Sequence, residues 1–92
     1  MTNLNKLYTI YDVQEPKEKE VLKDLLTNHL PKEYTAIVIN RLRHNDVQVD
    51  SQSVRNTKCG ISKNLVIFST IIEIAQEYKQ LSKKLKDNLN AV

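Results

Sequence analysis

The chain is poor in the residues that form sharp turns, cross-links and aromatic cores. Its 92 residues include one glycine, two prolines, one cysteine and no tryptophan, and 5% are aromatic. A β-sandwich or barrel needs many tight turns, so this scarcity favours helices. The single cysteine, Cys59, excludes a disulfide framework within the chain and fits a reducing compartment. We therefore expect one small, mostly α-helical cytoplasmic domain with a core of Leu, Ile and Val.

Long apolar runs and catalytic motifs are also missing. The sequence has no apolar run of the roughly 18 residues that suggest a membrane span, and its first residues do not read as a secretory signal. One glycine is too few for a glycine-rich phosphate loop. His29 and His44 have no metal-ligand spacing with Cys59. We therefore expect no membrane, no metal, no cofactor, no small-molecule substrate and no enzymatic activity.

The positive charge is concentrated in the middle of the chain. The net charge is +3, with a pI near 9.0. Residues 1–31 hold 4 basic and 5 acidic side chains, residues 32–64 hold 6 and 3, and residues 65–92 hold 4 and 3. This excess suits a surface that binds phosphates, although ordinary scatter of surface lysines would also produce it.

Apolar residues recur at helical spacing in four segments. The first begins at Pro16, carries Val21, Leu22, Leu25, Leu26 and Leu30, and must end before Pro31. The second begins at Pro31 and ends around residues 44–46. The third spans about residues 51–58, with Asp50 or Ser51 as its N-cap and Gly60 as its stop. The fourth is capped by Ser62 or Asn64 and is long. The prediction is an all-α bundle of about four helices with a long C-terminal helix.

The ends of the chain give weaker signals. Residues 1–14 alternate in polarity and are compatible with a short strand, a flexible arm or a loose helical turn. Residues 87–92 are expected to be disordered. We treat residues 1–92 as one domain, with a core unit at 34–76 and a C-terminal extension and tail at 77–92.

The third segment carries side chains that recognise nucleic acids. Four of them hydrogen-bond well to base edges, namely Gln52, Ser53, Arg55 and Asn56. Six others nearby suit phosphates: Arg41, Arg43, Ser51, Lys58, Lys63 and Asn64. The plain alternative is that this short helix only presents polar residues to water.

The fourth segment contains a heptad seam. Its apolar positions are Ile67, Ile71, Ile74, Tyr78, Leu81 and Leu85, at intervals of 4, 3, 4, 3 and 4. We expect the first half to dock on the core. The second half is expected to pair with another copy through Ile74, Tyr78, Leu81 and Leu85. The alternative is a long helix whose end frays in solvent.

Residues 34–76 resemble the helix-turn-helix of Cro-like and phage-repressor-like transcription regulators. The resemblance rests on VDSQSVRNTKCG at residues 49–60 and on the apolar pattern of Ile71, Ile72, Ile74 and Ala75. The connector RHNDVQV is longer than the family's tight turn, and Thr57 stands where a larger apolar residue is common. The resemblance implies a recognition helix bearing Gln52, Ser53, Arg55 and Asn56, and a dimer on a two-fold symmetric operator.

These expectations lead to a functional hypothesis. The chain is expected to bind double-stranded DNA sequence-specifically, as a homodimeric transcription regulator or repressor of phage or mobile-element type. The alternative belongs to another class: a protein-interaction adaptor or inhibitor that uses the amphipathic C-terminal helix.

Overall fold

Helices make up all the regular structure of the part of the chain that the structure describes, residues 3–91 of a computed structural model. There are five α-helices and one π-helical segment, which are α1 (Leu4–Ile10), α2 (Pro16–Asp24), η1 (Leu25–His29), α3 (Tyr34–His44), α4 (Ser51–Cys59) and α5 (Leu65–Asn90). The predicted all-α class, with its long C-terminal helix, is confirmed.

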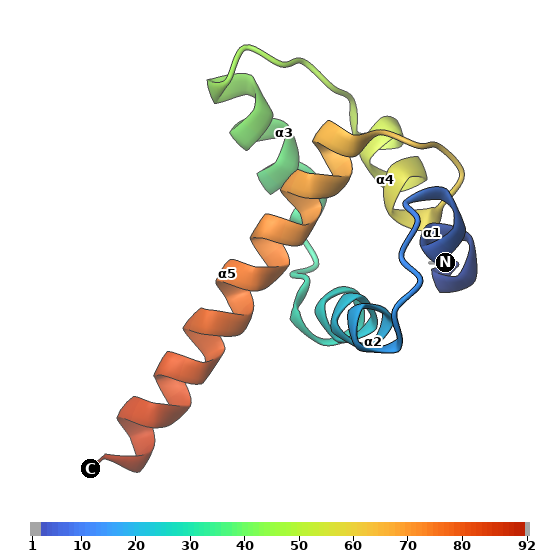
Figure 1. The fold of residues 1–92 in the computed structure, drawn as a ribbon. Helices are drawn as coiled ribbons and strands as arrows, with labels where there is room; N and C mark the ends of the chain where they lie inside the picture. Colours follow the sequence, from blue (N-terminus) through green and yellow to red (C-terminus); the bar gives the residue numbers. More distant parts are fainter. Residues whose placement is uncertain (1–2, 92) are drawn as a thin grey trace.

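The core forms around the first half of α5. Figure 1 shows α5 as a long rod, with the other helices gathered around its first half and its second half projecting away from them. Three residues of α5, Ile67, Ile71 and Ile74, are 0–1% exposed. They meet Leu7 of α1, Leu22 of α2, Leu26 of η1, Val38 and Leu42 of α3, and Val54 of α4 in one cluster. Since each neighbouring helix is short, α5 provides the surface on which they all bury their apolar sides.

The N-terminal segment is a helix, which corrects the expectation of a strand or an arm. The Asn3 side chain accepts a hydrogen bond from the Lys6 amide and so caps α1. Leu7 is completely buried. Alternating polarity suggested a strand, but the burial of Leu7 in the tertiary core decides in favour of a helix. Residues 1 and 2 of the predicted arm lie outside the described residues.

The second helical segment begins at Pro16, as predicted, and Leu30 before Pro31 is extended. Its last turn widens into the π-helix η1. The predicted apolar stripe is buried at Leu22, Leu25 and Leu26, whereas Val21 is 46% exposed. Val21 therefore lies at the margin of the stripe.

The unit from α3 to α4 follows the expected order. Helix α3 starts at Tyr34, three residues later than predicted, and ends at His44. Val47 and Val49 of the connector pack partly against the core. The Asp50 carboxylate accepts a hydrogen bond from the Ser53 amide at 2.7 Å, which makes Asp50 the N-cap of α4.

Helix α5 is longer than predicted. Its N-cap is Asn64, whose side chain accepts from the Ile67 amide. The helix continues to Asn90, so residues 87–90 are helical and the expectation of disorder there is wrong. Val92 lies outside the described residues.

Candidate nucleic-acid interface

Helix α4 is a short rod fixed at both ends and along one side. Val54 is fully buried and Thr57 is 1% exposed. The Thr57 hydroxyl donates to the Ser53 carbonyl at 2.8 Å, so its polar atom is satisfied inside the helix. Gly60 ends the helix at φ +85°, a left-handed conformation that glycine adopts without steric cost. The opposite side of α4 is therefore held outward on a rigid support.

The four predicted base-reading residues of α4 differ in exposure. Gln52 and Arg55 are exposed, and Ser53 and Asn56 are half-buried. The Gln52 amide nitrogen donates to the Asn56 side-chain oxygen at 2.9 Å, and Arg55 donates to the Gln52 oxygen at 3.3 Å. Arginine has five N–H donors, and this contact uses one of them, so a bidentate contact to another group remains available.

Three of the predicted phosphate contacts lie on or next to α4. Ser51 is its first residue, Lys58 lies in its last turn, and Lys63 is exposed in the connector that follows. The Lys58 ammonium lies 5.1 Å from the centre of the Tyr34 ring, which holds it beside the start of α3. Arg43 is exposed at the end of α3.

Arg41 and Asn64 have other roles in the folded chain. Arg41 donates to both carboxylate oxygens of Glu77, at 2.6 and 2.8 Å, and lies 3.9 Å from Glu73. Hydrogen bonding to Glu77 raises the pKa of Arg41, and the same contact lowers the pKa of Glu77. The Asn64 side chain caps α5. We therefore leave both residues out of the candidate interface.

One basic residue near α4 was missed by the sequence reasoning. The Lys6 Cβ lies 3.4 Å from the position that a Cβ on Gly60 would occupy. The Asn3 amide also donates to the Cys59 carbonyl at 3.4 Å, which joins α1 to the end of α4. Nothing in the sequence indicated that Lys6 lies beside the end of α4, because residues 1–14 carried no clear helical signal.

The acidic residue at the start of α4 is held by the backbone of that helix. The Asp50 carboxylate is the N-cap, and its hydrogen bond from the Ser53 amide lowers the Asp50 pKa. Its charge is thus directed at the amides of the first turn, which carry the positive end of the helix dipole. Asp50 remains charged at neutral pH and would face any anion that approached the N-terminus of α4.

The predicted dimerisation residues divide into two groups. Ile74 is 0% exposed and belongs to the core cluster, so it is buried within the monomer and not presented to a second copy. Tyr78, Leu81 and Leu85 are 40%, 60% and 58% exposed. Leu89, at 65%, continues the same stripe and was not predicted. We call Tyr78, Leu81, Leu85 and Leu89 the distal stripe.

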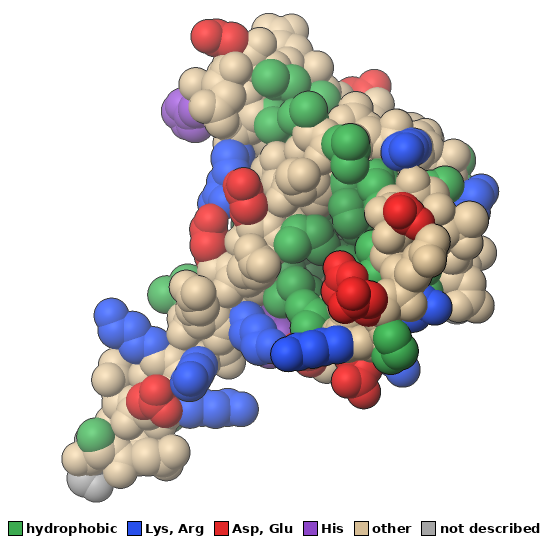
Figure 2. Space-filling model, viewed as in Figure 1, with side chains coloured by type: hydrophobic (Ala, Val, Ile, Leu, Met, Phe, Trp, Pro, Cys, Tyr) green, Lys and Arg blue, Asp and Glu red, His purple; other side chains and the backbone are tan. Residues whose placement is uncertain are grey.

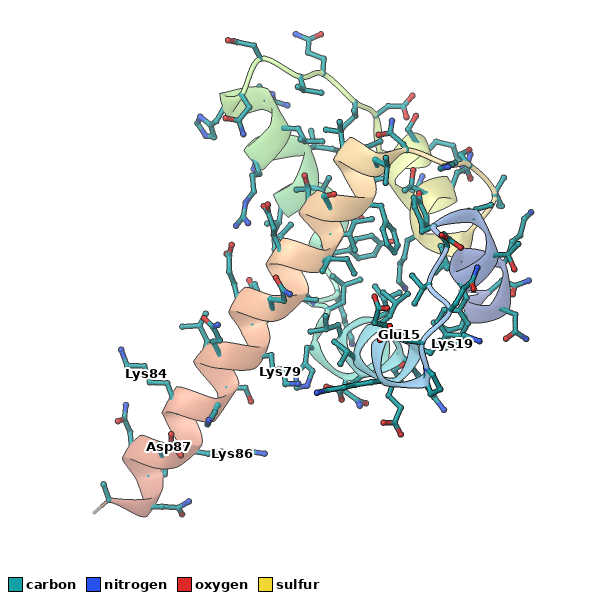
Figure 3. The ribbon with its side chains drawn as sticks, viewed as in Figure 1. Glu15, Lys19, Lys79, Lys84, Lys86 and Asp87 are labelled. Carbon is teal, nitrogen blue, oxygen red and sulfur yellow. The ribbon has the colours of Figure 1, made fainter. Side chains whose placement is uncertain are left out.

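Lysines surround the distal stripe. In Figure 3, Lys84 and Lys86 point away from opposite sides of the projecting half of α5, and Asp87 lies at the level of Lys86. Lys79 reaches back to Asp24, with the ammonium 3.0 Å from the carboxylate. Hydrogen bonds from Asn28 and Lys79 lower the Asp24 pKa. The distal half is therefore an amphipathic helix with a basic character.

A hydrophobic hollow lies between α2 and α5. Figure 2 shows apolar side chains gathered there, beside the rod of α5. The hollow has a volume of about 320 Å³ and is lined by Val13, Val21, Leu22, Phe68 and Ile72, among others. Its rim includes Lys17 and Glu18, one charge of each sign, so it favours neither anions nor cations.

Within residues 3–91 we find no group of three His, Cys, Asp or Glu side chains placed to bind a metal ion. Nor does any helix in this part combine the length and apolarity needed to cross a membrane. His29 of η1 contacts Asp24 of α2 at 3.2 Å.

Comparison with known proteins does not assign a family. The chain matches no protein-family model, no curated protein and no solved structure. The resemblance to Cro-like regulators therefore stays a prediction.

Proposed function

We propose that this protein binds double-stranded DNA sequence-specifically through the outward side of α4, as a homodimeric transcription regulator. The observation that supports the proposal most is the form of α4: a capped rod anchored by Val54 and Thr57, with Gln52 and Arg55 exposed on its free side. A short helix of this kind fits the major groove, where Arg pairs with guanine and Gln or Asn with adenine.

The charge around α4 agrees with a polyanionic partner. Residues 51–72 contain three basic side chains, Arg55, Lys58 and Lys63, and no acidic one. Lys6 lies beside the end of the same helix. Positive charge supplies the sequence-independent part of DNA affinity through release of counterions.

The decisive experiment compares two single-charge deletions. Duplexes are first selected from a random library with the full chain, and affinity is then measured for Arg55→Ala and for Lys86→Ala at several salt concentrations. Arg55→Ala should lose about tenfold or more on the selected duplex and relax one base position, because a bidentate base contact contributes about 1–3 kcal/mol. Lys86→Ala removes the same charge far from α4 and should leave base preference unchanged.

Two results would count against the proposal. An equal loss for Arg55→Ala on selected and random duplexes would show that Arg55 reads no base. A complete absence of duplex binding, even at low salt, would remove DNA as the partner.

The distal stripe supports a second candidate function. Four large apolar residues at 40–65% exposure on a projecting helix are unusual on a surface unless something covers them. Under this alternative, the protein is an adaptor or inhibitor, and an amphipathic helix of a partner packs against the stripe. Binding of a partner protein that Leu85→Asp abolishes, with no duplex bound by the wild type, would favour this candidate.

A further inference from the structure

A second apolar patch lies next to α4. Ile61, Leu65 and Val66 are 67%, 61% and 53% exposed, in the connector after α4 and in the first turn of α5. We call these three residues the apolar edge. It is separate from the distal stripe, which begins at Tyr78.

The apolar edge follows directly after α4 in the chain. The Asn56 carbonyl accepts hydrogen bonds from the amides of Ile61 and Ser62, at 2.9 and 3.2 Å. These bonds cap the end of α4 and hold the connector that carries Ile61 against it. Figure 1 shows that α4 and α5 both begin at the same end of the domain.

The apolar edge is also held rigidly. Asn64 caps α5, and its own amide donates to the Tyr11 hydroxyl at 3.0 Å. The Tyr11 ring stacks on Phe68 with 4.0 Å between the ring centres. The first turn of α5 is therefore fixed to the end of α1, so the backbone that carries Leu65 and Val66 is already ordered before a partner binds.

The charges around the apolar edge indicate the kind of partner. The segment that contains it, residues 51–72, carries three positive side chains and no negative one. An apolar surface that lies between positive side chains along the chain suits a partner that combines phosphates with exposed methyl groups. In the DNA major groove, the 5-methyl group of thymine is the apolar element that aliphatic side chains contact.

We propose that the apolar edge reads thymine methyl groups next to the bases contacted by α4, with Leu65 and Val66 as specificity-determining residues. The inference rests on the proposed DNA-binding function and extends it from α4 to the start of α5. It predicts that the preferred site contains thymines whose methyl groups are needed for full affinity.

The test uses the selected duplex and the same duplex with uracil in place of thymine, which removes only the methyl groups. Wild-type protein should bind the uracil duplex roughly fourfold more weakly for each methyl contacted, the factor expected for burying one such group. The double variant Leu65→Ala/Val66→Ala should bind both duplexes equally.

A control variant is available on α2, away from α4 and from the distal stripe. Val21→Ala removes apolar surface there and should keep the wild-type ratio between thymine and uracil duplexes. Circular dichroism on each variant verifies that the helices are retained, which is expected because all three substituted positions are at least 46% exposed.

The outcomes separate this inference from the proposed function. If the Leu65→Ala/Val66→Ala variant keeps the wild-type ratio, or if the wild type ignores the methyl groups, the inference fails. Base preference that depends on Arg55 would then leave the proposed function standing. If the full chain selects no duplex and the apolar edge instead binds a protein, both are overturned.

Discussion

Arg41 of α3 and Glu77 of α5 form a two-pronged ion pair, with guanidinium-to-carboxylate distances of 2.6 and 2.8 Å. The pair lies where α5 leaves the core, since Ala75 is buried and residues 76–91 are exposed. It therefore fastens the last core turn of α5 to α3. Both side chains are partly exposed, at 32% and 52%, so water and salt screen their attraction.

The first prediction concerns this ion pair. Because exposed pairs contribute little, a double-mutant cycle with Arg41→Met and Glu77→Gln should give a coupling free energy of about 0.5–1 kcal/mol. Urea unfolding of the four proteins measures it. The coupling should shrink in 1 M salt, whereas a coupling that salt does not change would mean that packing, not charge, joins the two residues.

The second prediction is a loss of stability in acid. Asp24, Asp50 and Glu77 accept hydrogen bonds as carboxylates, and each has a pKa below its ordinary value. Such groups stabilise the fold above the unfolded pKa of about 4, and this contribution disappears as pH falls through the lower folded pKa. The free energy of unfolding should therefore decrease from about pH 5 downwards.

Urea unfolding as a function of pH checks this. Glu77→Gln should make the decrease of the free energy of unfolding below about pH 5 less steep. Glu20→Gln, a change at an exposed glutamate of α2, serves as the comparison. If Glu20→Gln reduced this decrease as much as Glu77→Gln does, the loss of stability in acid could not be assigned to Asp24, Asp50 and Glu77.

The third prediction separates the buried and exposed parts of the heptad seam. Ile74→Val should lower the free energy of unfolding by about 0.5–1.5 kcal/mol, and Ile74→Ala by about 2–5 kcal/mol, because Ile74 is completely buried. Leu85→Ala, on the same seam but 58% exposed, should change the stability of the monomer by less than about 0.5 kcal/mol. Thermal or urea unfolding at low protein concentration tests this ranking.

The fourth prediction concerns Gly60, the stop of α4. At φ +85°, an alanine would be strained by about 1–2 kcal/mol, whereas Asn tolerates this conformation better and should cost less. Unfolding of Gly60→Ala and Gly60→Asn gives the comparison. Equal losses would point to crowding against Lys6 and not to the backbone conformation.

The fifth prediction concerns self-association. If the distal stripe pairs two copies, wild-type protein should sediment as a dimer at high concentration, and Leu81→Lys/Leu85→Lys should sediment as a monomer with unchanged helix content. A replacement at Lys83, Lys83→Ala, serves as the control because it leaves the apolar stripe intact. A wild type that stays monomeric at all concentrations would argue against homodimerisation.

Local rules in the sequence determined where most helices begin and end. Helix α2 begins at Pro16, and the helical segment that continues into η1 ends before Pro31. Asp50 caps the start of α4, and Gly60 ends it. These signals act through nearest-neighbour sterics and hydrogen bonds to adjacent amides, which need no tertiary partner. The outward position of Gln52 and Arg55 also follows from sequence, since Val54 and Thr57 occupy the apolar side of the same helix.

Tertiary contacts decided the remaining features. Residues 4–10 form a helix whose Leu7 is buried in the core, and Arg41 forms an ion pair with Glu77, 36 residues away along the chain. The heptad pattern ran unbroken from Ile67 to Leu85, yet the core covers Ile74 and leaves Leu81 exposed. Periodicity specifies which side of a helix is apolar; the length of the helices that pack against it determines how far along that side is buried.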